Sequence, residues 1–226
     1  MFDFLTELAE NNNKEWFNAH KAQYESAKLE ATTLFKHIYS ILTENDTLAS
    51  LKIYRIHRDL RFSNDKTPYK THFGCYIQRK EPHYLGGYYV CISPQETFIG
   101  GGFFEPSKDQ LLRIRQEISL NAKKFKDMME DEGIQKEFDG QLWGEELKTV
   151  PKGFQKDDPM IDYLRKKQFL LKHNYSLEEA KATNFTEKAI QGLLAMRPFF
   201  DFMTEALTTN LNGESISNNL RNRTPY

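Results

Sequence analysis

Three short segments with strand-like composition, separated by turn-forming residues, constrain the fold of this chain most. They are residues 71–78, 84–93 and 97–102. β-branched and aromatic residues favour strands, and connections this short join antiparallel neighbours. Together with a β-favouring segment at 52–62, these segments predict a mainly antiparallel meander.

Helical periodicity lies on both sides of these strands. Apolar residues repeat every three to four positions over about 15–44 and again over 186–207, where Pro198 predicts a kink or break. The sequence therefore predicts an α+β fold, with the antiparallel sheet covered by a long N-terminal helix and a C-terminal helix. No linker rich in Pro, Gly or Ser interrupts the chain. We expect one α+β domain over 1–210 and a polar, flexible tail over 211–226.

Shorter elements are expected between the strands and the final helix. Ser107 caps one helix, and a second over 121–132 ends at Gly133. Two further short strands are predicted around Asp139-Gly140, and another over 169–175. Ser176 and Glu179 have the spacing of a capping box.

Composition limits the class of protein. No stretch of about 18 apolar residues is present, so no membrane-spanning helix and no membrane partner are expected. The N-terminus lacks the basic start and apolar run of a signal peptide. The two cysteines, Cys75 and Cys91, fit a reducing cytoplasm, which is the predicted location. They lack Cys-x-x-Cys spacing, so we interpret both as small core residues.

Charged and hydrogen-bonding side chains gather between Arg55 and Lys70, where three arginines and two aspartates occur with a histidine, a serine and a tyrosine. Residues 51–80 carry eight Lys or Arg against two Asp, a net charge of +6 in a chain whose total is −1. A focal basic segment in a near-neutral chain is more typical of a small anionic ligand than of a broad nucleic-acid surface. A short nucleic-acid contact is also compatible with it.

An extended conformation over 53–62 would place alternate side chains on opposite faces. One face would then carry Arg55, His57, Asp59 and Arg61. Asp59 would hold its neighbouring arginines in place and stay ionised. Ser63 to Pro68 is predicted to turn and bring the following residues back towards the arginines. The predicted ligand-binding residues of this stretch are Arg55, Arg58, Arg61, Asp65, Lys66 and Lys70.

Two interpretations of the cluster are open. In the first, the arginine forks bind the carboxylate or phosphate of a ligand or substrate. In the second, the Arg/Asp network with Tyr69 is a buried polar strut that holds a sheet to a helix.

The stretch follows the pattern Arg-x-x-Arg-Asp-x-Arg-Phe-x-x-Asp-Lys-x-Pro-Tyr from Arg55 to Tyr69. In this it resembles a family of mainly bacterial proteins known as domain of unknown function 2461. The resemblance extends to three further stretches. Asn12 to Phe17, with Tyr24, resembles the family's opening helix, and Gly100 to Gly102 resembles its glycine run. Pro151 to Phe154, followed by Asp158-Pro159, resembles its later turn. The family has no established activity, so the resemblance implies no reaction, and any cofactor is unknown.

Three consecutive glycines, Gly100, Gly101 and Gly102, precede the helix expected at Ser107. Glycine amides before a helix can bind an anion, and a bulge that lets Phe103 pack is the equal alternative. The Gly-Lys-Ser/Thr ending of a P-loop is absent. We predict that these glycines form the other wall of one site with the turn at 58–70.

Catalytic templates are mostly absent, since the sequence has no Gly-x-Ser-x-Gly and no His-Glu-x-x-His. An enzyme would need an acid or a base, and the candidates are Asp59, His57 and Tyr69. The histidines lack a recognised metal spacing, so no metal site is predicted. We therefore expect binding of, or catalysis on, a small phosphate- or carboxylate-bearing ligand.

The alternative is a non-enzymatic interaction module that recognises acidic protein surface or nucleic acid. A concave pocket beside the cluster favours a ligand site, whereas a flat or convex basic face favours the interaction module.

Overall fold

A computed structural model describes residues 1–61, 65–210, 212, 214 and 215. Its contacts group into two compact units, each assembled from three stretches of the chain. Unit 1 comprises Met1–Gln78, Tyr89–Ile99 and Asn174–Gln191. Unit 2 comprises Arg79–Tyr88, Gly100–His173 and Gly192–Tyr226. Whether they form the single domain expected over 1–210 stays a prediction.

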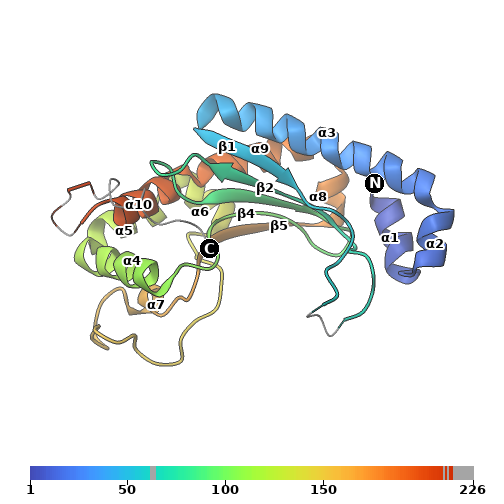
Figure 1. The fold of residues 1–226 in the computed structure, drawn as a ribbon. Helices are drawn as coiled ribbons and strands as arrows, with labels where there is room; N and C mark the ends of the chain where they lie inside the picture. Colours follow the sequence, from blue (N-terminus) through green and yellow to red (C-terminus); the bar gives the residue numbers. More distant parts are fainter. Residues whose placement is uncertain (62–64, 211, 213, 216–226) are drawn as a thin grey trace. The chain divides into compact units, whose positions relative to one another are not determined.

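The strands form one five-stranded antiparallel sheet in the order β1-β2-β3-β4-β5, so every neighbour in space is also a neighbour in sequence (Figure 1). The α+β fold and the meander are confirmed. The strand predicted over 169–175 is present and completes the sheet. The strand bounds are Leu48–Ile53 (β1), Phe73–Arg79 (β2), Gly87–Ile92 (β3), Thr97–Phe103 (β4) and Phe169–Tyr175 (β5).

The prediction of a strand over 52–62 is wrong, because β1 ends at Ile53. Beyond it the chain continues as an irregular antiparallel ribbon. The Tyr54 amide donates to the Gly74 carbonyl (2.9 Å), and the Lys70 amide donates to the Ile56 carbonyl (2.8 Å). Between these two bonds one side of the ribbon has a single residue, Arg55, and the other has three, residues 71–73. The two sides are unequal in length, so regular pairing stops here.

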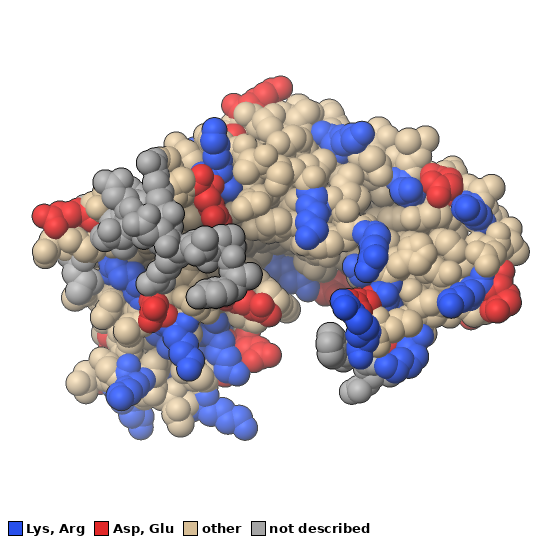
Figure 2. Space-filling model, in the orientation of Figure 1, with Lys and Arg blue, Asp and Glu red and all other residues tan. Residues whose placement is uncertain are grey.

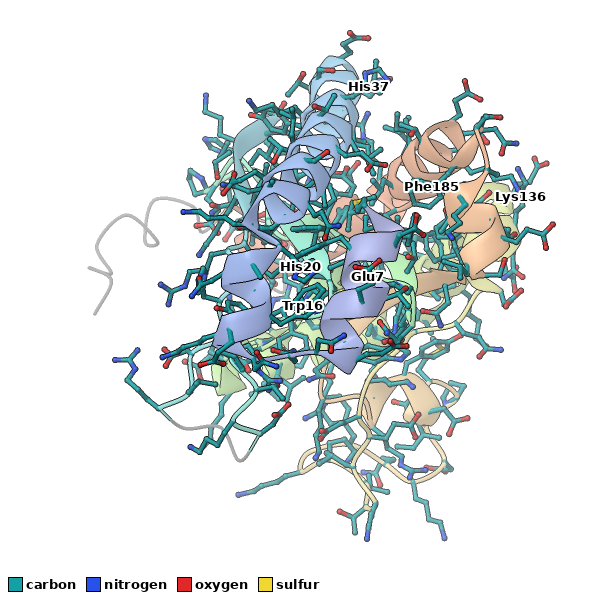
Figure 3. The ribbon with its side chains drawn as sticks, turned by 90° about the vertical axis from the view of Figure 1, so that its right-hand side faces the viewer. Glu7, Trp16, His20, His37, Lys136 and Phe185 are labelled. Carbon is teal, nitrogen blue, oxygen red and sulfur yellow. The ribbon has the colours of Figure 1, made fainter. Side chains whose placement is uncertain are left out.

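Unit 1 begins with three helices, α1 (Phe2–Glu10), α2 (Lys14–Ala19) and α3 (Lys21–Asn45). The long predicted helix is therefore interrupted at His20. The His20 ring stacks on Trp16 with centroids 4.0 Å apart, and its Nδ1 lies 2.8 Å from the Trp16 carbonyl oxygen (Figure 3). The interruption ends α2 before α3 begins, and Phe17 of α2 contacts Phe4 of α1 with ring centroids 6.4 Å apart.

Helix α3 packs along β1 and covers the sheet with the apolar stripe that the periodicity predicts (Figure 1). Its buried residues are Tyr24, Ala27, Ala31, Phe35, Ile38 and Leu42. Two further helices are α8 (Leu177–Lys181) and α9 (Phe185–Ala195). Helix α8 opens with the predicted capping box, in which the Ser176 hydroxyl accepts from the Glu179 amide.

Unit 2 contains α4 (Lys108–Leu120), α5 (Ala122–Met129), α6 (Glu132–Phe138), α7 (Ile161–Leu164) and α10 (Arg197–Thr208). Ser107 caps α4 as expected. Helix α10 packs on α4 and α5, and its Phe200 meets Tyr88 of the sheet edge-on at 4.9 Å. The predicted break near Pro198 is confirmed, since α9 ends at Ala195 and Pro198 lies in the first turn of α10.

Two local predictions in unit 2 are wrong. Gly133 does not end a helix but lies in the first turn of α6, where its amide donates to the Asp131 side chain. Residues 138–150 form no strand in the described chain, only isolated bridges such as Trp143 to Leu170. The reason is that the residues up to Phe138 belong to α6, so the left-handed turn at Asp139 (φ 54°) and Gly140 (φ 60°) ends a helix instead of joining two strands.

The glycine run has a steric explanation inside unit 2. A Cβ atom on Gly101 would lie 2.7 Å from Met196 Sδ and 2.8 Å from Phe200 Cζ. Gly102 has φ +134°, and a Cβ there would collide with the Phe169 carbonyl oxygen. Close packing against α10 and β5 therefore requires these two glycines.

The remaining predictions concern the cysteines, membrane segments and tail. Cys75 and Cys91 are both buried free thiols, and burial raises the pKa of Cys75 to about 12. None of the described helices has both the length and the apolar character needed to cross a bilayer. Residues 211, 213 and 216–226 lie outside the described chain, so the flexible tail stays a prediction.

Candidate functional site

The charged stretch of the sequence forms a loop between β1 and β2, and its ends are paired in antiparallel fashion. The Arg58 amide donates to the Pro68 carbonyl (2.9 Å), and His57 and Tyr69 form an isolated bridge. The pairing carries the chain back past the arginines, as the turn prediction required. Phe62, Ser63 and Asn64 lie outside the described residues.

The base of this loop is buried and aromatic. Ile56 and Tyr69 are both buried, and the Tyr69 ring stacks on Phe17 of α2 with centroids 4.0 Å apart. Asn12, in the turn between α1 and α2, clamps the Tyr69 backbone. Its side-chain amide donates to the Tyr69 carbonyl (2.9 Å), and its side-chain oxygen accepts from the Tyr69 amide (3.1 Å). The loop is thereby fixed to the N-terminal helices.

The outer part of the loop carries its ion pairs. Arg58 donates through Nη1 to an oxygen of Asp65 and to the Thr67 hydroxyl (2.9 Å). Arg61 grips Asp59 with a two-pronged fork, Nε to Oδ1 at 2.9 Å and Nη2 to Oδ2 at 2.6 Å. The side chains of Arg58 and Arg61 are 29% and 77% exposed, so these pairs are surface features. The buried strut weighed as an alternative does not describe them.

Local hydrogen bonds keep both aspartates ionised. The side chain and then the backbone amide of Arg61 lower the pKa of Asp59 to about 2. The Thr67 amide and hydroxyl, followed by Arg58, lower the pKa of Asp65 below its ordinary value. Asp59 was expected to stay ionised, and this direction agrees. A carboxylate with so low a pKa is a weak general base near neutral pH.

A pocket of about 540 Å³ opens beside this loop within unit 1. Lys and Arg side chains gather around the loop, with a few acidic side chains between them (Figure 2). The wall of the pocket combines two basic side chains, two carboxylates, a histidine and several neutral groups. The lining residues are Ala9, Asn12, Arg58, Asp59, Asp65, Thr67, Tyr69, Lys70, Thr71 and His72.

Lys70 differs from the other charged groups of this wall. Its Nζ lies 5.3 Å from the centre of the Tyr54 ring, and within the described residues it makes no ion pair. Burial lowers the pKa of Lys70 below 10.5, and the charges of Arg55 and Arg58 lower it further. Burial also lowers the pKa of His72, with smaller contributions from Lys70 and Arg58. His72 is therefore neutral at pH 7.

Residues 1–202 match the family described as "Conserved hypothetical protein (DUF2461)". The chain belongs to this family. No curated protein and no solved structure matches the chain. Membership in DUF2461 confirms the resemblance that the Arg55–Tyr69 pattern carried, and it leaves the function to be inferred from the site itself.

The predicted site residues of this DUF2461 chain fall into three groups. The pocket brings together Arg58, Asp59, Asp65, Tyr69 and Lys70. The described residues that line the pocket do not include Arg55, His57, Arg61 or Lys66. The Lys66 ammonium group instead donates to the Leu60 carbonyl (3.1 Å). The joint wall with Gly100, Gly101 and Gly102 stays a prediction, because these glycines belong to unit 2.

Sequence reasoning missed part of the pocket wall. His72 was considered only as a metal ligand, although its place two residues after Lys70 would put both side chains on one face of an extended segment. Asn12 entered the sequence analysis only through the stretch that resembles the family's opening helix, and nothing local connects it with a loop 57 residues away. Thr67 was assigned only to the turn. No group of three or more His, Cys, Asp or Glu able to hold a metal occurs among the described residues.

Proposed function

We propose that the pocket beside the β1–β2 loop binds a small anionic ligand bearing a phosphate or carboxylate group, in the cytoplasm that the sequence predicts. One observation carries this proposal: Lys70 lines the pocket with a partly buried ammonium group and no acidic partner among the described residues. Placing a cation in such a position is unfavourable unless something compensates for the lost solvation. A bound anion supplies that compensation.

The surrounding charges support this polarity. Asp59 and Asp65, the two carboxylates of the wall, already bind Arg61 and Arg58 respectively. Arg55 and Arg58 also act on Lys70 through their positive charges, so the electrostatic potential around its amine is more positive still. An incoming phosphate or carboxylate would therefore meet a net attractive field in a partly desolvated wall.

Preorganisation also supports a ligand site. Asn12 and Phe17 fix the backbone and ring of Tyr69, which adjoins Lys70 in the sequence. A cation held on such a fixed segment loses little entropy when it binds a ligand. The concave wall favours this function over the interaction module, for which a flat basic face was expected.

The test measures thermal stability with inorganic phosphate and sulfate. At phosphate ten times its dissociation constant, mass action adds about 1.4 kcal/mol to the free energy of unfolding, roughly a 3–6 °C rise in Tm. We expect this rise for the wild type and its loss in Lys70→Met.

Lys52→Met is the matched control. Lys52 Nζ lies 5.2 Å from the same Tyr54 ring, but Lys52 is exposed on β1 and does not line the pocket. Each substitution replaces one lysine beside the Tyr54 ring with an uncharged side chain of similar length. Equal loss of the phosphate effect in both variants, or no phosphate effect in the wild type, would reject the anion site in favour of the interaction module.

A further inference from the structure

We propose that the ε-amine of Lys70 is a nucleophile that forms an imine with the carbonyl group of a small anionic aldehyde or 2-oxo acid. This inference rests on the proposed anion site and names the class of its substrate. It follows from the arrangement of groups around Lys70, which differs from that expected for a lysine that serves only as a positive charge.

Lysines that act as fixed cations usually face a carboxylate, which stabilises the ammonium form. The two carboxylates of this pocket are engaged elsewhere, Asp59 with Arg61 and Asp65 with Arg58 and Thr67. Lys70 instead packs against the Tyr54 ring. Its amine therefore lies in the pocket wall without a neighbouring acid, within the described residues, to hold its proton.

The charged neighbours of Lys70 act in the opposite direction. Arg55 and Arg58 both repel the ammonium form, and burial penalises it further. A desolvated lysine beside other cations has a larger fraction of neutral amine, which is the nucleophilic form and the usual origin of imine-forming lysines. An anion bound to Arg58 offsets part of the arginine charge, whereas burial, the largest cause of the lowered pKa of Lys70, remains.

An anionic group on the substrate then has a specific role. Its charge is attracted to Arg58, which shares the pocket wall with Lys70 and is joined to the same ribbon through the Pro68 carbonyl. The carbonyl carbon next to that group is thereby held near the amine. Such positioning converts a slow bimolecular addition into a fast reaction within a complex.

The reaction balances without an oxidant or a metal. The Lys70 nitrogen forms a bond to the carbonyl carbon while the C=O π bond breaks, and the oxygen takes a proton to give a carbinolamine. The C–O bond then breaks, water leaves and a C=N bond forms. His72, neutral and in the same wall, can accept the proton lost by nitrogen and return it to the departing hydroxyl.

The experiment traps the imine in the full-length protein with sodium cyanoborohydride and locates the adduct by peptide mass mapping. Glyoxylate and glycolaldehyde phosphate are the two probes, and uncharged glycolaldehyde is the reference. We expect Lys70 to be labelled at least tenfold faster than Lys52 by one or both anionic probes, and inorganic phosphate to slow this labelling. Selective reaction of one probe identifies a carboxylate or a phosphate as the anionic group.

Variants separate the inference from the anion site on which it rests. Lys70→Arg keeps the positive charge and should retain stabilisation by phosphate while losing the adduct at position 70. His72→Gln should slow trapping about tenfold or more, as expected for the loss of a proton carrier. A wild type that phosphate stabilises, but in which Lys70 reacts no faster than Lys52, overturns the imine and leaves the anion site standing. A wild type with neither property overturns both.

Discussion

Two arginine clusters in this chain have similar residue types and opposite environments. Arg79 of unit 2 is fully buried, pairs with Asp201 at 2.8 Å, and lies within 5.3 Å of the centres of the Tyr84 and Phe200 rings. Arg58 of unit 1 keeps 29% of its side chain exposed and shares a pocket wall with Lys70. Arg79 is enclosed by its partners, whereas Arg58 and Lys70 face space that a ligand could occupy.

The comparison shows where the buried strut lies. The interpretation weighed for the Arg55–Tyr69 motif fits Arg79, which links the end of β2 to α10 inside unit 2. The Leu85 carbonyl also accepts from Arg79, and the Leu85 amide donates to Thr204 of α10 (3.1 Å). A buried ion pair packed against aromatic rings thus holds a helix to the sheet in this protein. Arg79 forms this strut, and the Arg55–Tyr69 motif does not.

The largest expected effect concerns Asp201. Asp201→Ala leaves a fully buried guanidinium without its carboxylate, which should cost about 3 kcal/mol, the lower end of the range for breaking a buried pair. The lower end applies because Asp201 is 53% exposed and water can approach the pair. Urea denaturation measures the change. Arg79→Met should cost less, because the carboxylate that remains is solvated and the methionine fills the space between the rings.

If Arg79→Met were the more damaging of the two changes, the packing of the guanidinium between Tyr84 and Phe200 would outweigh its charge, and the cluster would be aromatic rather than ionic in origin.

Arg58→Ala is expected to have a smaller effect on stability and a larger effect on binding. Exposed ion pairs contribute about 0.2–1 kcal/mol, so the Tm of the unliganded protein should fall by only a few degrees. Stabilisation by phosphate should be lost, because Arg58 contributes to the positive wall of the pocket. Differential scanning fluorimetry with and without phosphate measures both. A fall in Tm as large as that of Asp201→Ala would return the motif to the strut interpretation.

The fold was largely predictable because its signals are local. Strands β2, β3 and β4 are separated by short turns with their own residue chemistry, and the Ser176 capping box is readable over four positions. The Arg79 strut was not predictable. Its partner Asp201 lies 122 residues away, and an arginine at a strand end has the same local pattern whether it is buried or exposed.

The site was predictable only in part. The cluster of arginines and aspartates located the loop, but periodicity suggested a regular strand, where the structure has a ribbon whose two sides differ in length. Spacing also could not distinguish paired from unpaired cations. Arg61 and Lys70 looked equivalent in sequence, yet Arg61 binds Asp59 and does not line the pocket, whereas Lys70 lines it and has no acidic partner among the described residues.

Lys70→Met should change stability in the opposite direction from Arg58→Ala. The folded pKa of Lys70 is lowered, so between that pKa and 10.5 the unfolded chain binds more protons than the folded protein. The free-energy cost of holding Lys70 charged in the folded protein is therefore greatest below this range and is lost as the pH rises through it. At pH 7 the variant should therefore be slightly more stable than the wild type without ligand. The difference should shrink as the pH approaches 10.5, measured by urea denaturation at several pH values. A variant that is less stable at pH 7 would show that the Tyr54 contact outweighs the burial cost.

The smallest expected effect concerns the ion pair between Asp59 and Arg61. Breaking it should hardly change the melting temperature, because both side chains are exposed. The change is instead visible in the pKa of the carboxyl group. Arg61→Gln should raise the pKa of Asp59 from about 2 towards 3.8, since hydrogen bonds from Arg61 are the largest cause of the shift. Any stabilisation by this pair is present above pH 3.8 and is lost as the pH falls through about 2. Carbon-13 NMR of the aspartate carboxyls measures the titration directly.

Arg55→Gln is the matched control for this titration, because Arg55 acts on Asp59 through charge alone and most weakly of the causes. It should raise the pKa of Asp59 less than Arg61→Gln does. The reverse order would mean that Asp59 turns inward to the cations around Lys70 rather than outward to Arg61. Lys70 would then have an acidic partner, and the contrast between the enclosed Arg79 and the open, unbalanced charge of the pocket would disappear.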